Sequence, residues 1–251
     1  MKREIFKDKI KHQRMLGYWS ILPLVQVHEI LYFANFDFII IDLEHGTYSF
    51  QEAAEVVSAV QSKGMFALIR PSSHDPKEIL RCLELGVDGI CIPQVSNVEQ
   101  AKKIVNACMY PPMGMRGASG FTRATKYGQL NFVHHTKISN EQLFVSLLIE
   151  DKEGLENAPE IAELLGVDCI YFGTYDIASS LKIDNQAGAE VNQIIQTSID
   201  SIDDKGVVFG QVAVDYGQFN ALDERINFVP CGVDCGIILA GAEKFMQELK
   251  K

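Results

Sequence analysis

The sequence lacks the features that would associate the protein with nucleic acids or a membrane. Its 33 Asp and Glu residues outnumber its 23 Lys and Arg residues, which gives a formal net charge of −10. No basic cluster offsets this excess, and an acidic chain repels the phosphate backbone of nucleic acids. No apolar run approaches the ~18 residues of a membrane span. We therefore expect neither nucleic acid nor a membrane as a partner.

Patterns typical of disulfide frameworks and zinc sites are also missing. The six cysteines are scattered, several of them lie in apolar segments, and no two have the Cys-x-x-Cys spacing. Such cysteines are typical of buried, reduced thiols. The charged N-terminal segment 1–16 has no apolar stretch like that of a secretory signal peptide. These observations predict a cytoplasmic protein.

What the sequence does contain is a regular alternation of strand-like and helix-like segments. Short apolar runs such as 64–71 alternate with segments of helical periodicity such as 50–63. The last strand is predicted at 227–241, and a final short helix follows it at 242–249. No linker, charge block or low-complexity segment divides the chain, so residues 1–251 are expected to form one domain.

Eight strand–helix units in one domain predict a (β/α)₈ TIM barrel with its active site at the carboxyl ends of the strands. The alternative fold is a doubly wound open sheet. That fold usually carries a Gly-x-Gly-x-x-Gly or Walker-type loop after a strand, and neither motif is present.

Ionisable residues follow several of the predicted strands directly. The apolar run Phe38–Ile41 is followed by Asp42 and His45, and an Asp close to a His is a common arrangement for a general base. The alternative is a capped helix N-terminus with an incidental His. Because the carboxyl ends of barrel strands meet at one mouth, we expect the ionisable residues there to lie together. This set comprises Asp42, His45, Arg70, Glu150 and Asp176.

Two of these residues are candidates for a metal site. Glu150 and Asp176 are hard oxygen ligands with no His or Cys beside them in the sequence. Such a pair suits an octahedral Mg²⁺, Mn²⁺ or Co²⁺ ion that keeps water ligands and shares its remaining positions with substrate oxygens. Arg70 offers a planar set of donors for a carboxylate or a developing enolate oxygen.

A long Gly- and Pro-rich connection covers residues 110–128. Stretches of this kind in compact domains are often functional, and we favour a substrate lid. The alternative is a binding place for the phosphate or nucleotide of another substrate, to which Arg116, Arg123 and Lys126 would contribute.

These residues lie in motifs that resemble the HpcH/HpaI family of metal-dependent (class II) pyruvate aldolases, which includes the dihydroxyheptenedioate and ketodeoxyglucarate aldolases. The similarity covers nearly the whole chain. Its most specific motifs are Asp42-Leu-Glu-His45-Gly, Ile69-Arg70-Pro71, Pro111-Pro-Met-Gly-Met-Arg116-Gly, Glu150 and Phe172-Gly-Thr-Tyr-Asp176.

The resemblance implies a carbon–carbon lyase that cleaves a 2-oxo-4-hydroxy acid to pyruvate and an aldehyde. It assigns a divalent metal to Glu150 and Asp176. It makes His45, oriented by Asp42, the base, and it places Arg70 at the substrate oxygen. It also implies a homo-oligomer, usually a hexamer in which the C-terminal helix is exchanged between neighbours. The substrate-binding positions that it implies are Trp19, Arg70, Leu148, Gly173, Thr174 and Tyr175.

The chain departs from the family pattern at two places. Leu148 stands where the heptenedioate enzymes carry a Gln, and Gly173-Thr174-Tyr175-Asp176 replaces the frequent Gly-Pro-x-Asp. We expect pyruvate to be held mainly by the metal and Arg70. We also expect the aldehyde half to be less acidic than succinate semialdehyde.

Two other functions remain open at this point. One is a lyase for an acyl-CoA or phosphoenolpyruvate on the same fold. The other is a catalytically silent protein with an aldolase fold, which Leu148 favours weakly and the intact set of charged residues opposes.

Overall fold

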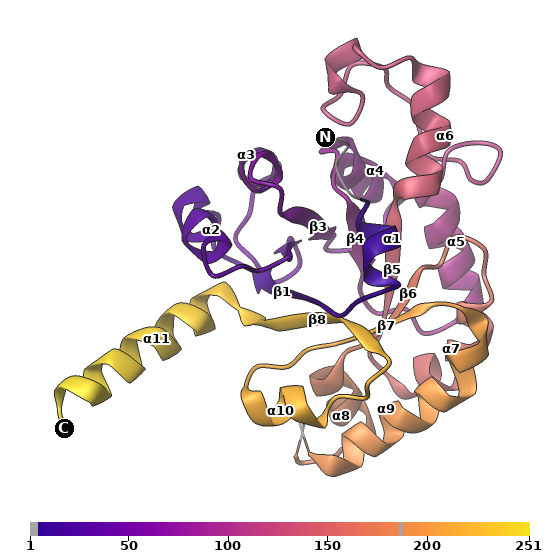
Figure 1. The fold of residues 1–251 in the computed structure, drawn as a ribbon. Coiled ribbons are helices and arrows are strands. Elements are labelled where there is room, and N and C mark those ends of the chain that lie inside the picture. The colour runs from indigo at the N-terminus through magenta and orange to yellow at the C-terminus, as the bar shows by residue number, and fades with distance from the viewer. Residues whose placement is uncertain (1–4, 186–187) are drawn as a thin grey trace.

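The strands close into a barrel, as predicted. The computed structural model describes residues 5–185 and 188–251. Eight parallel strands pair in sequence order, and β1 also pairs with β8, which excludes the open sheet (Figure 1). The strands are β1 (Met15–Ser20), β2 (Phe38–Asp42), β3 (Phe66–Arg70), β4 (Gly89–Ile92), β5 (Phe144–Ile149), β6 (Cys169–Phe172), β7 (Val208–Gln211) and β8 (Ile226–Val233).

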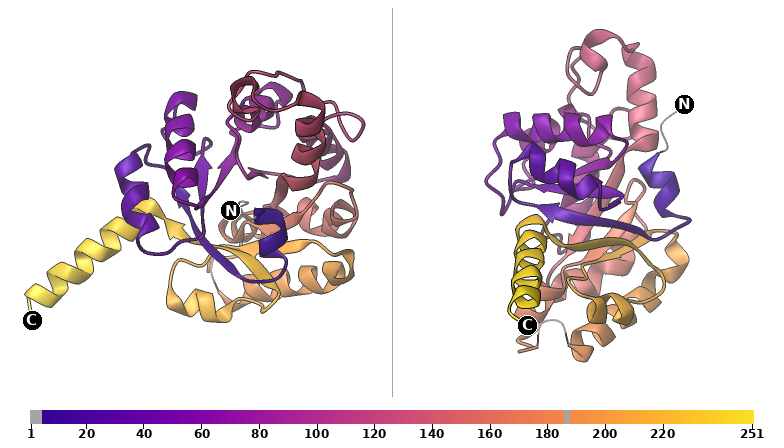
Figure 2. Two further views of the ribbon diagram at one scale, coloured as in Figure 1. Left: turned by 45° about the horizontal axis from the view of Figure 1, so that its top comes forward. Right: turned by 60° about the vertical axis from the view of Figure 1, so that its left-hand side comes forward.

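Helices separate the strands and pack on the outside of the barrel (Figures 1 and 2). Several begin at a side chain that accepts a backbone N–H, such as Ser49 in a capping box and Asn97. In the part of the chain that the structure describes, no helix has the length and apolarity required to span a membrane. The α-helices are α1 (Phe6–Ile10), α2 (Val25–Tyr32), α3 (Phe50–Ser62), α4 (Pro76–Glu84), α5 (Val98–Cys108), α6 (Phe132–Gln142), α7 (Lys152–Ala162), α8 (Thr174–Leu181), α9 (Ala189–Ile202), α10 (Tyr216–Ala221) and α11 (Asp234–Leu249).

Aromatic side chains close the amino-terminal end of the barrel. Phe6 of α1 lies among four phenylalanines at or near the starts of strands, with ring centroids 5.0–6.0 Å away. Alternate strand residues point inward, so these rings form the lowest layer of the interior. The four partners are Phe38, Phe66, Phe144 and Phe228. The amino-terminal end is therefore packed solid, and ionisable groups occupy the opposite end.

The predicted eighth strand was too long. β8 ends at Val233, and residues 234–249 form α11. Asp234 is fully buried and accepts hydrogen bonds from Ser20 Oγ and from the backbone N–H groups of Ile21, Leu22 and Cys235. This carboxylate ties the β1 loop to the start of α11, so the chain turns into a helix although its sequence is apolar enough for a strand. Helices α6 and α8 were also not predicted.

Helix α11 projects away from its own barrel (Figures 1 and 2). Large apolar side chains along it are left exposed, with exposed fractions of 62% for Phe245, 48% for Met246 and 65% for Leu249. Further exposed side chains on the same helix are Ile238 and Leu239. An apolar helix of this kind has no contact surface on its own subunit that would bury it.

Candidate active site

A buried ion pair joins the ends of the neighbouring strands β2 and β3. Asp42 and Arg70 are paired in the strand register and are 2% and 8% exposed. Arg70 Nε donates to Asp42 Oδ1 at 2.8 Å, and Nη2 donates to Oδ2 at 2.5 Å. Asp42 Oδ1 also accepts the backbone N–H groups of Glu44 and His45. One carboxylate thus fixes both the guanidinium and the start of the following loop.

Arg70 is held from three sides. Its Nη1 lies 3.2 Å from Glu44 Oε2, and its guanidinium lies 4.4 Å from the centre of the Trp19 ring. Burial works against its charge, but the hydrogen bonds and charge of Asp42 outweigh burial and raise the pKa of Arg70. Two of its five N–H groups donate to Asp42, so the N–H groups that make no hydrogen bond to Asp42 are left for a ligand.

The expected pairing of Asp42 with the His45 ring is not formed. Both Asp42 oxygens bind Arg70, and what they accept from His45 is its backbone N–H. The His45 side chain is 71% exposed, and its Nε2 lies 3.9 Å from Glu44 Oε2. The predicted Asp42–His45 pairing is wrong because the strand register sets Asp42 opposite Arg70. The carboxylate beside the imidazole is therefore that of Glu44.

Glu150 follows β5 directly, and the pKa of its carboxylate is strongly raised. Its Oε2 accepts the backbone N–H of Gln94 at 2.6 Å. A Cβ added to Gly173 would lie 2.6 Å from Glu150 Cγ, so the glycine leaves the space in which this side chain lies. Burial raises the pKa of Glu150 to about 7, the Gln94 N–H opposes this shift, and the negative charge of Asp176 adds to it.

Glu150 and Asp176 fit a divalent cation. Asp176 lies exposed in the first turn of α8, near enough for its charge to disfavour ionisation of Glu150. Two carboxylates that repel each other are a suitable donor set for a hard cation, which removes the repulsion. Within residues 5–185 and 188–251, no group of three or more His, Cys, Asp or Glu is arranged around a metal position. The pair could therefore supply two ligands, with substrate and water supplying the others.

Apolar side chains form the floor below these groups. Leu148 is 1% exposed and belongs to the apolar cluster inside the barrel, together with Trp19 and Tyr171. The rings of Trp19 and Tyr171 meet edge to face with centroids 5.9 Å apart. The expected substrate positions Trp19 and Leu148 thus lie beneath the charged groups, and both are largely covered.

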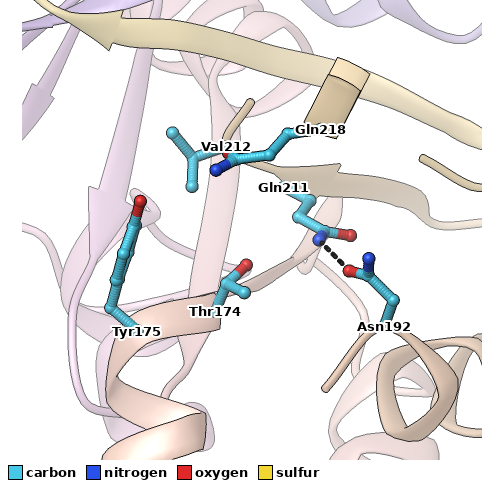
Figure 3. Close-up of a pocket in the computed structure, with 6 residues that line it drawn as sticks. All are labelled: Thr174, Tyr175, Asn192, Gln211, Val212 and Gln218. Carbon is cyan, nitrogen blue, oxygen red and sulfur yellow. Dashed lines mark hydrogen bonds between the residues drawn. The ribbon is translucent and has the colours of Figure 1, made fainter. Parts of the chain in front are cut away.

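A small cavity lies at the ends of β6 and β7, and two of its lining residues, Thr174 and Tyr175, directly precede Asp176 in the sequence (Figure 3). Its volume is about 10 Å³, and its lining carries no charged side chain. Thr174 is 4% exposed, and its hydroxyl makes no hydrogen bond to any described residue. Gln211 is 5% exposed and donates to Asn192 Oδ1 at 3.1 Å. The lining residues are Thr174, Tyr175, Asn192, Gln211, Val212 and Gln218.

The 110–128 loop is not a lid over the mouth of its own barrel. The backbone N–H of Ala124 donates to Glu84 O, and Arg123 Nη1 donates to Leu85 O, just before β4 begins. Arg116 is buried against Glu84, with Nη2 3.4 Å from Oε1. The loop therefore lies at the amino-terminal ends of the strands. The lid prediction is wrong for this subunit, and Arg116 and Arg123 lie too far from the mouth to form a phosphate site there.

Two side chains at the mouth were not assigned a role from the sequence. Glu44 contacts Arg70, and Gln94 Nε2 donates to Glu44 Oε1 at 3.0 Å. Glu44 lies between Asp42 and His45 in the sequence, and Gln94 lies two residues after β4. Their positions near the ends of strands could have identified both residues from the sequence. Gln94 was missed because it carries no charge, and only ionisable residues were considered.

Comparisons with known proteins show which family the chain is similar to. The family described as HpcH/HpaI aldolase/citrate lyase matches residues 16–240. A pyruvate aldolase of Rhizobium etli is 32% identical over 241 residues, which cover 95% of this chain and 94% of the relative. A 4-hydroxy-2-oxo-heptane-1,7-dioate aldolase of Klebsiella pneumoniae is 32% identical over 248 residues, covering 95% and 91%. A crystal structure of an HpcH/HpaI aldolase/citrate lyase family protein from Burkholderia cenocepacia superposes with a TM-score of 0.91 at 23% identity, covering 98% of each chain.

The perturbed carboxyl of Glu150 predicts a pH-dependent stability in the metal-free protein. Its pKa is raised from 4.5 to about 7 on folding, so its contribution to stability is fully present below pH 4.5 and is lost as the pH rises through 7. In EDTA, Glu150→Gln should match the wild type near pH 4. Above pH 7 the variant should be more stable by up to about 3 kcal/mol, as urea unfolding would measure. Glu160→Gln, an exposed control on α7, should follow the wild type. Identical pH dependence in all three proteins would contradict the assignment.

Proposed function

The chain belongs to the HpcH/HpaI aldolase/citrate lyase family, and we propose that its mouth residues perform a class II aldolase reaction with a divalent cation held by Glu150 and Asp176. The enzyme cleaves a 2-oxo-4-hydroxy acid to pyruvate and an aldehyde, and it catalyses the reverse addition. The observation that carries the assignment of the site is the position of Arg70. Its bound guanidinium lies at the same barrel end as the Glu150–Asp176 pair.

The reaction requires electron density to leave the bond between C3 and C4. A bound Mg²⁺, Mn²⁺ or Co²⁺ ion would supply a Lewis acid that polarises the 2-oxo group. Arg70 donates remaining N–H groups to the oxygen that gains negative charge. Because Asp42 and Glu44 already hold the guanidinium, little reorganisation is needed as the charge develops.

His45 acts on the hydroxyl at C4. Its exposed imidazole accepts the hydroxyl proton, directly or through a water molecule, and C4 becomes the aldehyde carbon. The C3–C4 bond breaks, and its electron pair forms the enolate of pyruvate. A proton then returns to C3 and completes pyruvate. Glu44, 3.9 Å from the ring, stabilises the imidazolium that forms in between.

Activity assays test this function. We expect retro-aldol cleavage to stop in EDTA and to return with Mg²⁺, Mn²⁺ or Co²⁺. His45→Ala should lower turnover by about 10²–10⁴-fold, the usual contribution of a general base, with little change in pyruvate affinity. His134→Ala, which removes an exposed His on α6, serves as the control. Full activity in EDTA would exclude the metal. An equal loss of turnover and pyruvate affinity in His45→Ala would make His45 a binding residue.

The cavity beside Thr174 supports an aldehyde half that carries hydroxyl groups. Its lining offers hydroxyl and amide groups but no cation, so a carboxylate placed there would remain uncompensated. A volume of about 10 Å³ matches one water-sized group. The buried Thr174 hydroxyl can serve such a group as donor or acceptor. We infer that the preferred aldehyde is neutral and hydroxylated, in contrast to succinate semialdehyde.

A cycle of enzyme and substrate changes tests this specificity. Thr174→Val should lower kcat/KM several-fold for a 2-hydroxyaldehyde, because one hydrogen bond contributes about 0.5–1.5 kcal/mol. The same substitution should leave kcat/KM for the corresponding deoxyaldehyde unchanged. Thr122→Val is a matched control, since it removes another buried, unpaired hydroxyl in the loop at the far end of the barrel. Equal losses for both aldehydes would contradict a hydroxyl subsite and leave the aldolase function intact.

The exposed apolar residues of α11 support assembly with further copies of the chain. Helix α11 leaves its own barrel with Phe245 and Met246 exposed. Contact with a neighbouring subunit that buries these side chains is therefore energetically favourable. We propose a homo-oligomer, a hexamer by resemblance to the family, in which α11 packs on a neighbour.

Light scattering tests the assembly. Phe245→Asp places a charge in the apolar face and should reduce the molar mass toward that of one subunit. Gln247→Asp introduces the same charge two residues along, outside this face, and should leave the mass unchanged. An assembled Phe245→Asp protein would show that α11 is not an interface.

Cysteine usage supports a cytoplasmic location. All six cysteines are free, and four of them are buried in the fold. Free thiols of this kind persist in reducing compartments. We therefore propose that the enzyme works in the cytoplasm.

A further inference from the structure

Gln94 combines an unusual backbone conformation with hydrogen bonds to two carboxylates. It follows β4 with a φ of 54°, in the left-handed region that few residues other than glycine adopt. Its backbone N–H donates to Glu150 Oε2 at 2.6 Å, and its side-chain Nε2 donates to Glu44 Oε1 at 3.0 Å. Strained backbone of this kind persists at functional sites because surrounding contacts fix it.

The residues on either side of Gln94 provide those contacts. Pro93 O accepts a hydrogen bond from His74 Nε2 at 2.6 Å. The N–H of Val95 donates to Leu148 O at 3.0 Å, which continues the pairing between β4 and β5. With both neighbours held, the N–H and the side chain of Gln94 keep their separate directions. The conformation is thus set by the barrel wall rather than by the sequence preference of a glutamine.

The two carboxylates that Gln94 binds belong to different parts of the mouth. Glu150 is the proposed metal ligand. Glu44 contacts the guanidinium of Arg70 at 3.2 Å and lies 3.9 Å from the ring nitrogen of His45. The charges of Glu44 and Glu150 oppose each other, since Glu44 disfavours ionisation of Glu150. Gln94 supplies each of them with a neutral donor.

We propose that Gln94 is a positioning residue that holds Glu150 in place for the cation through its backbone and holds Glu44 against Arg70 and His45 through its carboxamide. This inference rests on the proposed aldolase function. It also explains how a mouth with several acidic groups keeps a fixed geometry. Without the carboxamide, Glu44 can turn away from Arg70 or toward the cation.

Three substitutions separate the two roles. Gln94→Met keeps the side-chain length and the backbone preference of a non-glycine residue but donates nothing to Glu44. Gln94→Gly also removes the carboxamide, and it adopts a positive φ without strain. Gln94→Val removes the carboxamide as well, but a β-branched residue strongly disfavours a positive φ, so its N–H should move away from Glu150.

We expect Gln94→Met and Gln94→Gly to lower kcat by about tenfold, as for the loss of one hydrogen bond to a charged group, with KM nearly unchanged. Their affinity for Mn²⁺, measured by isothermal titration calorimetry, should equal that of the wild type. Gln94→Val should bind Mn²⁺ at least several-fold more weakly. Thermal unfolding of each variant checks that it is folded. Gln94→Gly should fold even if another variant does not, because glycine adopts the positive φ without strain.

Two results would overturn the inference. Unchanged kcat in Gln94→Met and Gln94→Gly would remove the role of the carboxamide. Equal Mn²⁺ affinity in Gln94→Gly and Gln94→Val would remove the role of the backbone N–H. Failure of the aldolase function itself has a different signature: the wild type would cleave no 2-oxo-4-hydroxy acid, while the calorimetric comparison of Gly and Val would still report on Gln94.

Discussion

The buried pair of Asp42 and Arg70 is the interaction on which the rest of the mouth depends. Removing one partner of such a pair leaves an unpaired buried charge, which typically destabilises a protein by about 3–5 kcal/mol. The pair also organises its surroundings. Asp42 holds the backbone of the loop that follows β2, and Arg70 holds Glu44, which in turn is bound by Gln94. Glu150 joins the network through the Gln94 N–H. A change at Asp42 would therefore reach the proposed metal site through Arg70, Glu44 and Gln94.

The two ends of the barrel serve different purposes. The amino-terminal end is closed by the phenylalanine rings around Phe6, and Gly17 allows Phe38 to pack where any larger residue would clash. This packing contributes stability through buried apolar surface. The carboxyl end holds like charges and an unpaired hydroxyl at Thr174, both of which cost stability in the absence of ligands. The well-packed end lets the protein keep a mouth that is poised to bind a cation and a substrate.

The surface outside the mouth is shaped by two segments that leave the barrel. The 110–128 loop and α6 lie at the amino-terminal end, and α11 extends away from β8. Neither segment covers the mouth of its own subunit. Access for a small 2-oxo acid is therefore open in the single chain, and selectivity must come from the wall between β6 and β7 or from a neighbouring subunit.

The sequence by itself determined the barrel and most of its strands, because alternating apolar runs and helical periodicity follow from local backbone preferences and burial. The end of β8 was the exception. The sequence also placed Glu150 directly after β5 and Asp176 a few residues after β6. The pairings across the mouth were decided only by the tertiary structure. Asp42 lies three residues from His45 in sequence, yet the strand register sets it opposite Arg70, whose five donors compete better for the carboxylate. The left-handed turn at Gln94 that brings Glu150 and Glu44 together has the same origin. Both depend on contacts between residues from different strands, which no local pattern in the sequence encodes.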